Sequence, residues 1–201
     1  MITQLLIAVT IGAVGSYLSF FKPALLSKNI VPLDSSILKW IASFISLVAL
    51  SLLIVYVDPK TNEEWIEFSF LSVFYFIAVT DLYSKIIPNR LVLVLLGITL
   101  LQLAQQFEFE FLLAGGVIFL ILTTSNLLTN KFFKKNLFGW GDVKLIAVLG
   151  LFTGWEVLWI MYIAIILGGL LSIVGLFAKK INRTTQIPLA FFLYLGVLIM
   201  Y

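Results

Sequence analysis

The uncharged stretch VLWIMYIAIILGGLLSIVGLFA, residues 157–178, decides the fold class of this sequence. A helix needs about 20 mostly apolar residues to cross the hydrocarbon core of a bilayer, and this stretch is long enough to do so. Comparable apolar segments lie at 2–21, 37–57, 65–82, 90–106, 109–129, 141–155 and 187–201. The pattern predicts an all-α, polytopic membrane bundle of eight transmembrane segments, forming a single domain over residues 1–201.

The composition supports the same class. Hydrophobic residues make up 62% of the 201 residues and charged residues only 11%, whereas soluble domains contain about 25% charged residues. The apolar N-terminus lacks a basic start and a small-residue cleavage pattern, so we expect a first span at 2–21 rather than a removable signal peptide. We expect no nucleic-acid partner, and the net charge of +3 says little about one, because in a membrane protein the placement of Lys and Arg matters more than their sum.

The charged residues sort by side of the membrane. When the eight segments are threaded back and forth, 12 of the 13 Lys and Arg residues fall on one side, with Lys60 the exception. This bias predicts that the basic side is cytoplasmic and that both termini are external. The acidic residues expected outside are Asp58, Glu63, Glu64, Glu67, Glu108, Glu110 and Glu156. Asp34, Asp81 and Asp142 remain on the cytoplasmic side.

The sequence contains neither cysteine nor histidine, which excludes the usual zinc sites, thiol nucleophiles and imidazole bases. We expect no metal and no organic cofactor, so carboxylates, hydroxyls or lysines must supply any chemistry. Two segments, 145–155 and 187–201, are short for full spans, which is tolerable where a helix end lines a cavity. The small-residue pairs favour close helix packing. These are Gly150 and Gly154, Gly115 and Gly116, and Gly168 and Gly169.

Asp81 and Asp142 are expected at the same membrane face, one at the end of the third span and the other at the start of the sixth. Each has a structural explanation: Asp142 could cap its helix, and Asp81 could pair with Lys85 four positions on. Together they suit an acid–base pair in which one carboxyl is protonated and the other activates water. Asp142, at a helix N-terminus, is the one we expect to stay ionised.

Gly139 and Gly141 flank Trp140 directly before Asp142. Because glycine has no Cβ, we expect the backbone here to take irregular dihedral angles and to let an extended peptide approach closely. A single G-x-G-D sequence is a weak signal, since it occurs by chance in many loops.

Longer motifs carry a more specific resemblance. NLFGWGDVKLIAVLGLFTGW, residues 136–155, resembles the second-aspartate motif of type IV prepilin peptidases, membrane aspartyl proteases of the G-x-G-D kind. TDLYSKIIPN, residues 80–89, is similar to their first motif, with Asp81 followed by Pro88 and Asn89. IPLAFFLYLG, residues 187–196, is similar to their C-terminal motif but departs from it at four positions, and we assign it no catalytic role. The resemblance covers about residues 81–196. GAVGSYLSF, residues 12–20, is more weakly similar to the N-terminal G-S-F-L segment of longer family members.

The resemblance implies an aspartyl endopeptidase with Asp81 and Asp142 as its dyad. Its substrates would be prepilins or pseudopilins, which lose a short basic leader at the cytoplasmic face of the cell membrane. Many bacterial members also methylate the new N-terminus and carry a four-cysteine zinc site in a long loop after the first span. Here that loop is only about 22–36 and has no cysteine. We therefore expect a peptidase without N-methyltransferase activity.

The supporting residues have local explanations as well. Pro88 and Asn89 form a good turn and helix start before the fourth span, which is compatible with positioning Asp81. Lys144 either follows the positive-inside bias or helps to hold a charged substrate beside Asp142.

Four alternatives compete with this interpretation. An archaeal preflagellin peptidase would share the motifs and differ only in substrate. The presenilin group also uses G-x-G-D, but with Y-D and P-A-L motifs, whereas Thr80 precedes Asp81 here and Leu189 follows Pro188. A proton-coupled transporter could use two aspartates as a relay, although the chain shows no internal repeat. An assembly scaffold without activity is the fourth.

Overall fold

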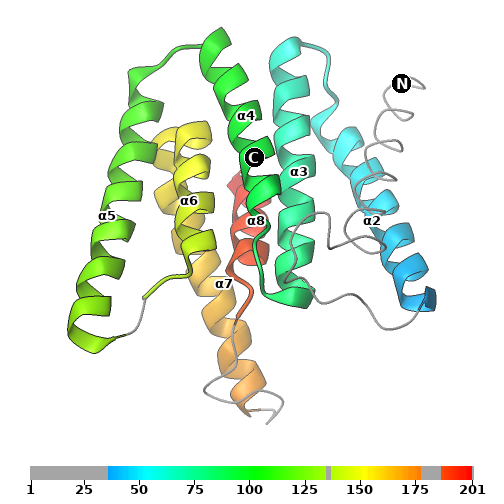
Figure 1. Ribbon diagram of the computed structural model, residues 1–201. Coiled ribbons are helices and arrows are strands. Elements are labelled where there is room, and N and C mark those ends of the chain that lie inside the picture. Colours follow the sequence, from blue (N-terminus) through cyan, green and yellow to red (C-terminus); the bar gives the residue numbers. More distant parts are fainter. Residues whose placement is uncertain (1–35, 135–136, 178–186, 201) are drawn as a thin grey trace.

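The computed structural model describes residues 36–134, 137–177 and 187–200 (Figure 1). All regular structure in these ranges is helical, which confirms the expected all-α class. The elements are α2 (Ser36–Val57), α3 (Asn62–Ser84), α4 (Asn89–Gln105), α5 (Phe109–Phe133), α6 (Trp140–Thr153), the 3-10 turn η3 (Gly154–Glu156), α7 (Val157–Phe177) and α8 (Leu189–Met200). The expected span at 2–21 lies outside the described residues.

The helices run alternately up and down the bundle from α2 to α8 (Figure 1). Three continuous helical stretches are long and apolar enough to cross a membrane: Asn62–Ser84, Phe109–Phe133 and Trp140–Phe177. Shorter apolar helices occupy Ile41–Val55, Asn89–Gln105 and Leu189–Met200. Their composition and their number identify a membrane protein.

Local signals account for the helix ends that differ from the sequence-based bounds. α3 begins at Asn62 rather than at 65 because Thr61 forms a capping box with Glu64, in which each residue accepts a backbone N–H from the other. α5 continues past 129 to Phe133 and ends where Lys134 takes a left-handed conformation (φ 53°). The start of α3 and the end of α5 contain polar residues that a helix tolerates. A prediction from hydropathy alone leaves such residues out of the helix.

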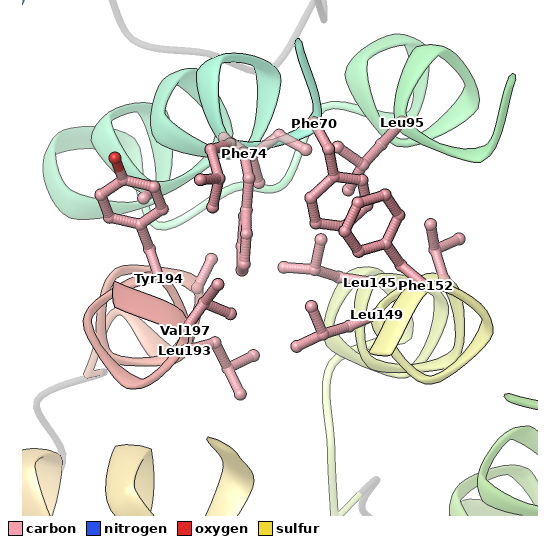
Figure 2. Packing of buried hydrophobic residues seen from close by; sticks show 14 of the residues in the cluster. Phe70, Phe74, Leu95, Leu145, Leu149, Phe152, Leu193, Tyr194 and Val197 are labelled. Carbon is pink, nitrogen blue, oxygen red and sulfur yellow. The ribbon is translucent and has the colours of Figure 1, made fainter. Parts of the chain in front are cut away.

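The core lies between α3, α4, α6 and α8 (Figure 2). Phe70 of α3 stacks on Phe152 of α6 with ring centroids 3.6 Å apart, and Phe74 meets Tyr194 of α8 edge-on at 5.6 Å. Leu145 and the neighbouring apolar residues of α6 fill the space between these aromatic pairs and are buried. The short helix α8 therefore packs directly on α3, whereas α6 packs on α5 and α4 and meets α3 through side chains such as Phe152.

Small residues bring α5 and α6 together, as the glycine pattern predicts. A Cβ on Gly115 would lie 2.5 Å from the side chain of Leu151 and 2.9 Å from its backbone nitrogen, and a Cβ on Gly150 would lie 3.1 Å from Gly115 Cα. Gly116 and Gly169, in contrast, would meet nothing within 4 Å. In the two adjacent glycine pairs, therefore, only Gly115 and Gly168 belong to a tight helix contact.

Gly154 has a second role besides the close packing expected of it. It takes a positive φ of 61° and ends α6, and a Cβ there would be 2.7 Å from the ring of Phe111. Left-handed backbone at this position is available mainly to glycine, so Gly154 allows the sharp change from α6 into α7.

Candidate active site

A cavity of about 570 Å³ opens at the end of the bundle where α3 ends and where α4, α6 and α8 begin. Its lining contains both candidate aspartates and four of the five other residues singled out from the sequence, Pro88 being the exception. The lining residues are Asp81, Lys85, Ile86, Ile87, Asn89, Leu137, Gly139, Trp140, Gly141, Asp142, Lys144, Ile187 and Leu189. Three motifs that are far apart in the sequence thus meet at one cavity.

Asp81 lies in the last turn of α3 and is only 5% exposed. Its Oδ2 accepts a hydrogen bond of 2.8 Å from the backbone N–H of Ala190, in the first turn of α8. The first N–H groups of a helix have no partner within the helix, and they carry the positive end of its dipole. The start of α8 therefore stabilises the carboxylate of Asp81 and orients it.

Asp142 occupies the first turn of α6, where Gly139 is the N-cap residue. The Asp142 carboxylate folds back toward the backbone of Gly139, and Asp142 is the third helical residue, where a carboxylate complements the positive end of the helix dipole. Asp142 is half-buried and lines the same cavity as Asp81. The two carboxyl groups are near enough to interact electrostatically.

The irregular dihedral angles expected at the two glycines are absent, so that part of the prediction is wrong. Gly139 has φ −63° and ψ 141°, which any residue adopts, and Gly141 lies inside the helix without a positive φ. What excludes a side chain is space. A Cβ on Gly139 would lie 2.7 Å from Asp142 Oδ2, and a Cβ on Gly141 would lie 3.0 Å from the Cβ of Ile87. The glycines let the Asp142 carboxylate fold back and let α6 approach the residues that precede α4.

The Pro88–Asn89 pair begins α4, as predicted. Pro88 is the N-cap residue with extended backbone and is buried, and Asn89 is the first helical residue. Asn89 Oδ1 accepts a hydrogen bond of 3.2 Å from Lys144 Nζ, so the two aspartate motifs are joined by an exposed polar contact. Lys144 therefore has a partner in the site and is more than a marker of topology.

The alternative explanation for Asp81 is wrong. Lys85 ends α3 in a left-handed conformation (φ 54°), and its backbone N–H donates to the carbonyl oxygen of Asp81. Within the described residues its ammonium group makes no ion pair with the Asp81 carboxylate, because the carboxylate faces the start of α8.

Acidic residues gather at the opposite end of the bundle, on the side that the sequence predicts for them. Glu67 and Glu156 line a second cavity of about 360 Å³ together with Gln102, and Glu63 lies beside Glu67 in a smaller one. Lys60, at the same end, forms an exposed ion pair of 2.7 Å with Asp58, whose carboxylate raises the pKa of that lysine. The end of the bundle that carries these glutamates is therefore opposite to the end that holds Asp81 and Asp142.

Sequence reasoning missed two contacts at the site. The stretch 187–196 was given no catalytic role, yet Ala190 contacts Asp81 and Leu189 lines the cavity. Asn126 of α5 was not singled out at all, although its side chain is fully buried and bonds to Phe138, just before Gly139. A buried amide within an apolar span was the available signal for Asn126, whereas a backbone donor such as Ala190 leaves none.

Two carboxyl groups at one cavity can exchange protons with a bound water and with a peptide carbonyl, which is the chemistry of an aspartyl dyad. The cavity is open, and its wall includes residues at the beginnings of α4, α6 and α8.

Comparison with known proteins identifies one match. Residues 68–174, just over half of the chain, match the model of the type IV leader peptidase family. The matched range contains Asp81, Pro88, Asn89, the glycine pair and Asp142, and it ends before α8. No curated protein and no solved structure matches the chain.

Proposed function

The chain belongs to the type IV leader peptidase family, and on this premise we propose that it is a membrane aspartyl endopeptidase with Asp81 and Asp142 as its dyad. The observation that carries this proposal is that both side chains line one cavity of about 570 Å³, although they come from different helices. Its substrates are prepilins or pseudopilins, from which it removes a short basic leader just after a glycine.

The reaction needs only the two carboxyl groups and one water molecule. One aspartate, ionised, takes a proton from the water as the oxygen attacks the scissile carbonyl carbon. The other aspartate, protonated, gives its proton to the carbonyl oxygen, so that a neutral tetrahedral intermediate forms. The intermediate then collapses: the second aspartate takes back a proton from one hydroxyl as the carbonyl re-forms, the C–N bond breaks, and the proton held by the first aspartate passes to the leaving amine.

The proposed orientation places this cavity at the cytoplasmic face of the cell membrane, with eight spans and both termini outside. Three features support it: the alternating directions of α2 to α8 (Figure 1), the position of Lys85 and Lys144 at the aspartate end, and the acidic residues at the other end. Basic residues favour the cytoplasmic side. A basic leader is also available to the enzyme only on that side.

The proposal excludes N-methyltransferase activity and a metal requirement. It rests on the sequence, which has no cysteine to form the zinc site of the longer family members.

A direct assay tests the function. The purified protein in detergent or lipid vesicles is incubated with a prepilin that carries a basic leader, and the products are identified by mass spectrometry. We expect one cut after the glycine, no added methyl group when a methyl donor is present, and full activity in a metal chelator. Uptake of protons or solute by protein-containing vesicles without cleavage would instead support the transporter.

A further inference from the structure

Asn126 lies in α5 and is fully buried, with 0% exposure. Its carboxamide makes two hydrogen bonds to one residue: Nδ2 donates to the carbonyl oxygen of Phe138 at 2.9 Å, and Oδ1 accepts the backbone N–H of Phe138 at 2.8 Å. A buried polar group is tolerated when its bonds are satisfied, and this side chain provides both a donor and an acceptor to one peptide segment.

Phe138 is the residue directly before Gly139, the N-cap of α6. It lies outside the helix, so the ladder of α6 does not satisfy its N–H and carbonyl groups. The Asn126 side chain replaces those missing partners. Asp142 follows Phe138 by four residues, and its carboxylate folds back toward Gly139, so a short stretch of backbone connects the segment held by Asn126 to one of the two aspartates.

The contact also fixes α6 relative to α5. The two helices touch closely through Gly115 and Gly150, and Asn126 adds a directional contact at the aspartate end of the same interface. A glycine contact sets the separation of two helices, whereas a two-point hydrogen bond sets the position of one peptide group. The beginning of α6 is therefore defined by α5 as well as by its own sequence.

We propose that Asn126 is a positioning residue that holds the segment Phe138–Asp142 so that the Asp142 carboxylate faces the cavity. The expected effect on kcat rests on the proposed function, whereas the positioning of the segment does not. Asn126 touches neither aspartate, so it acts through the backbone alone. A displacement of about 1 Å at a reacting group lowers the rate roughly 100-fold, so removal of both bonds should lower kcat by about 10- to 100-fold and leave KM nearly unchanged.

The test compares three variants in the purified, full-length protein. Asn126→Leu keeps the approximate shape and removes both bonds, and Asn126→Asp keeps the acceptor but loses the donor while ionised. Gln102→Leu is the matched control, because Gln102 Nε2 donates to the carbonyl oxygen of Phe152 at 3.3 Å, near the other end of α6. The readouts are kcat, KM, the melting temperature, and hydrogen exchange at the amide of Phe138 and at residues 145–152.

We expect Asn126→Leu to lose kcat and to exchange faster at Phe138, with unchanged protection at 145–152, while Gln102→Leu keeps its kcat. Wild-type kcat in a folded Asn126→Leu protein overturns the proposal, and so does a loss of kcat without faster exchange at Phe138. If the Leu variant does not accumulate, Asn126→Asp carries the same test. The exchange readout also separates the two ideas, because it reports on positioning even if the wild-type protein cleaves no prepilin.

Discussion

Asp81 Oδ2 and the backbone N–H of Ala190 form a hydrogen bond of 2.8 Å between residues 109 positions apart in the sequence. The bond connects the end of α3 to the first turn of α8, and it places the C-terminal motif beside one of the candidate catalytic groups. Hydrogen bonds to charged groups contribute about 1.5–3 kcal/mol, which is enough to fix the orientation of a single carboxylate.

Ala190→Pro removes this donor. Proline is tolerated in the first turn of a helix, where the N–H has no helical partner, so α8 should still form. We expect kcat to fall by about 10-fold or more, in line with the free energy of the lost bond. Glu110→Pro makes the same change at the second position of α5, outside the cavity lining. Equal activity of the two variants would show that the Ala190 bond is unimportant for catalysis.

Gly139→Ala should separate activity from stability. The new Cβ would lie 2.7 Å from Asp142 Oδ2, the far end of a side chain that can rotate. The fold should tolerate this change, but the carboxylate must leave its observed position, so we expect kcat to fall at least 10-fold with little change in melting temperature. Gly97→Ala is the control, because a Cβ there meets nothing within 4 Å. A fully active Gly139→Ala enzyme would contradict the site geometry.

Gly115→Ala should destabilise the bundle, and Gly116→Ala should not. At Gly115 the added Cβ would overlap the side chain and the backbone nitrogen of Leu151, whereas at Gly116 it meets nothing. Overpacking costs about 1–3 kcal/mol, and replacing a mid-helix glycine by alanine contributes about 0.5–1 kcal/mol of stability. Unfolding in detergent measures the difference, and similar midpoints for the two neighbours would refute the close α5–α6 contact.

The exposed bond between Asn89 and Lys144 predicts coupled effects. Asn89→Ala and Lys144→Met should each lower kcat/KM only a few-fold, because exposed polar contacts are weak, at about 1 kcal/mol or less. The double variant should lose little more than either single variant, since both remove the same 3.2 Å bond. Additive losses would indicate that the two residues act separately.

Hydropathy and turn chemistry were enough to predict much of the fold. The helices from α2 to α8 correspond to the predicted segments, and the start of α4 at Pro88 and Asn89 is confirmed. These features depend on neighbouring residues, so one sequence contains the information. The meeting of Asp81 and Asp142 at one cavity was also predictable, because the alternating threading places both at the same end of the bundle.

Other features of the site depend on contacts between distant segments and could not be inferred in the same way. Gly139 was expected to need unusual dihedral angles, yet it is restricted by the returning carboxylate of Asp142. Ala190 acts through a backbone group that every residue except proline has, so its side chain gives no signal. Asn126 did give a signal, as a polar residue in an apolar span, but its partner Phe138 becomes evident only in the packed structure.

The cleavage rates of Asp81→Asn and Asp142→Asn, measured separately on a prepilin per amount of folded protein, test the central claim most directly. Asparagine keeps the shape and removes the acid–base function, which contributes about 10²- to 10⁴-fold in rate. Asp58→Asn is the control, because Asp58 is exposed and paired with Lys60 at the other end of the bundle. The account predicts a loss of at least about 100-fold in each of the two site variants and none in the control; a wild-type rate in either site variant would contradict it.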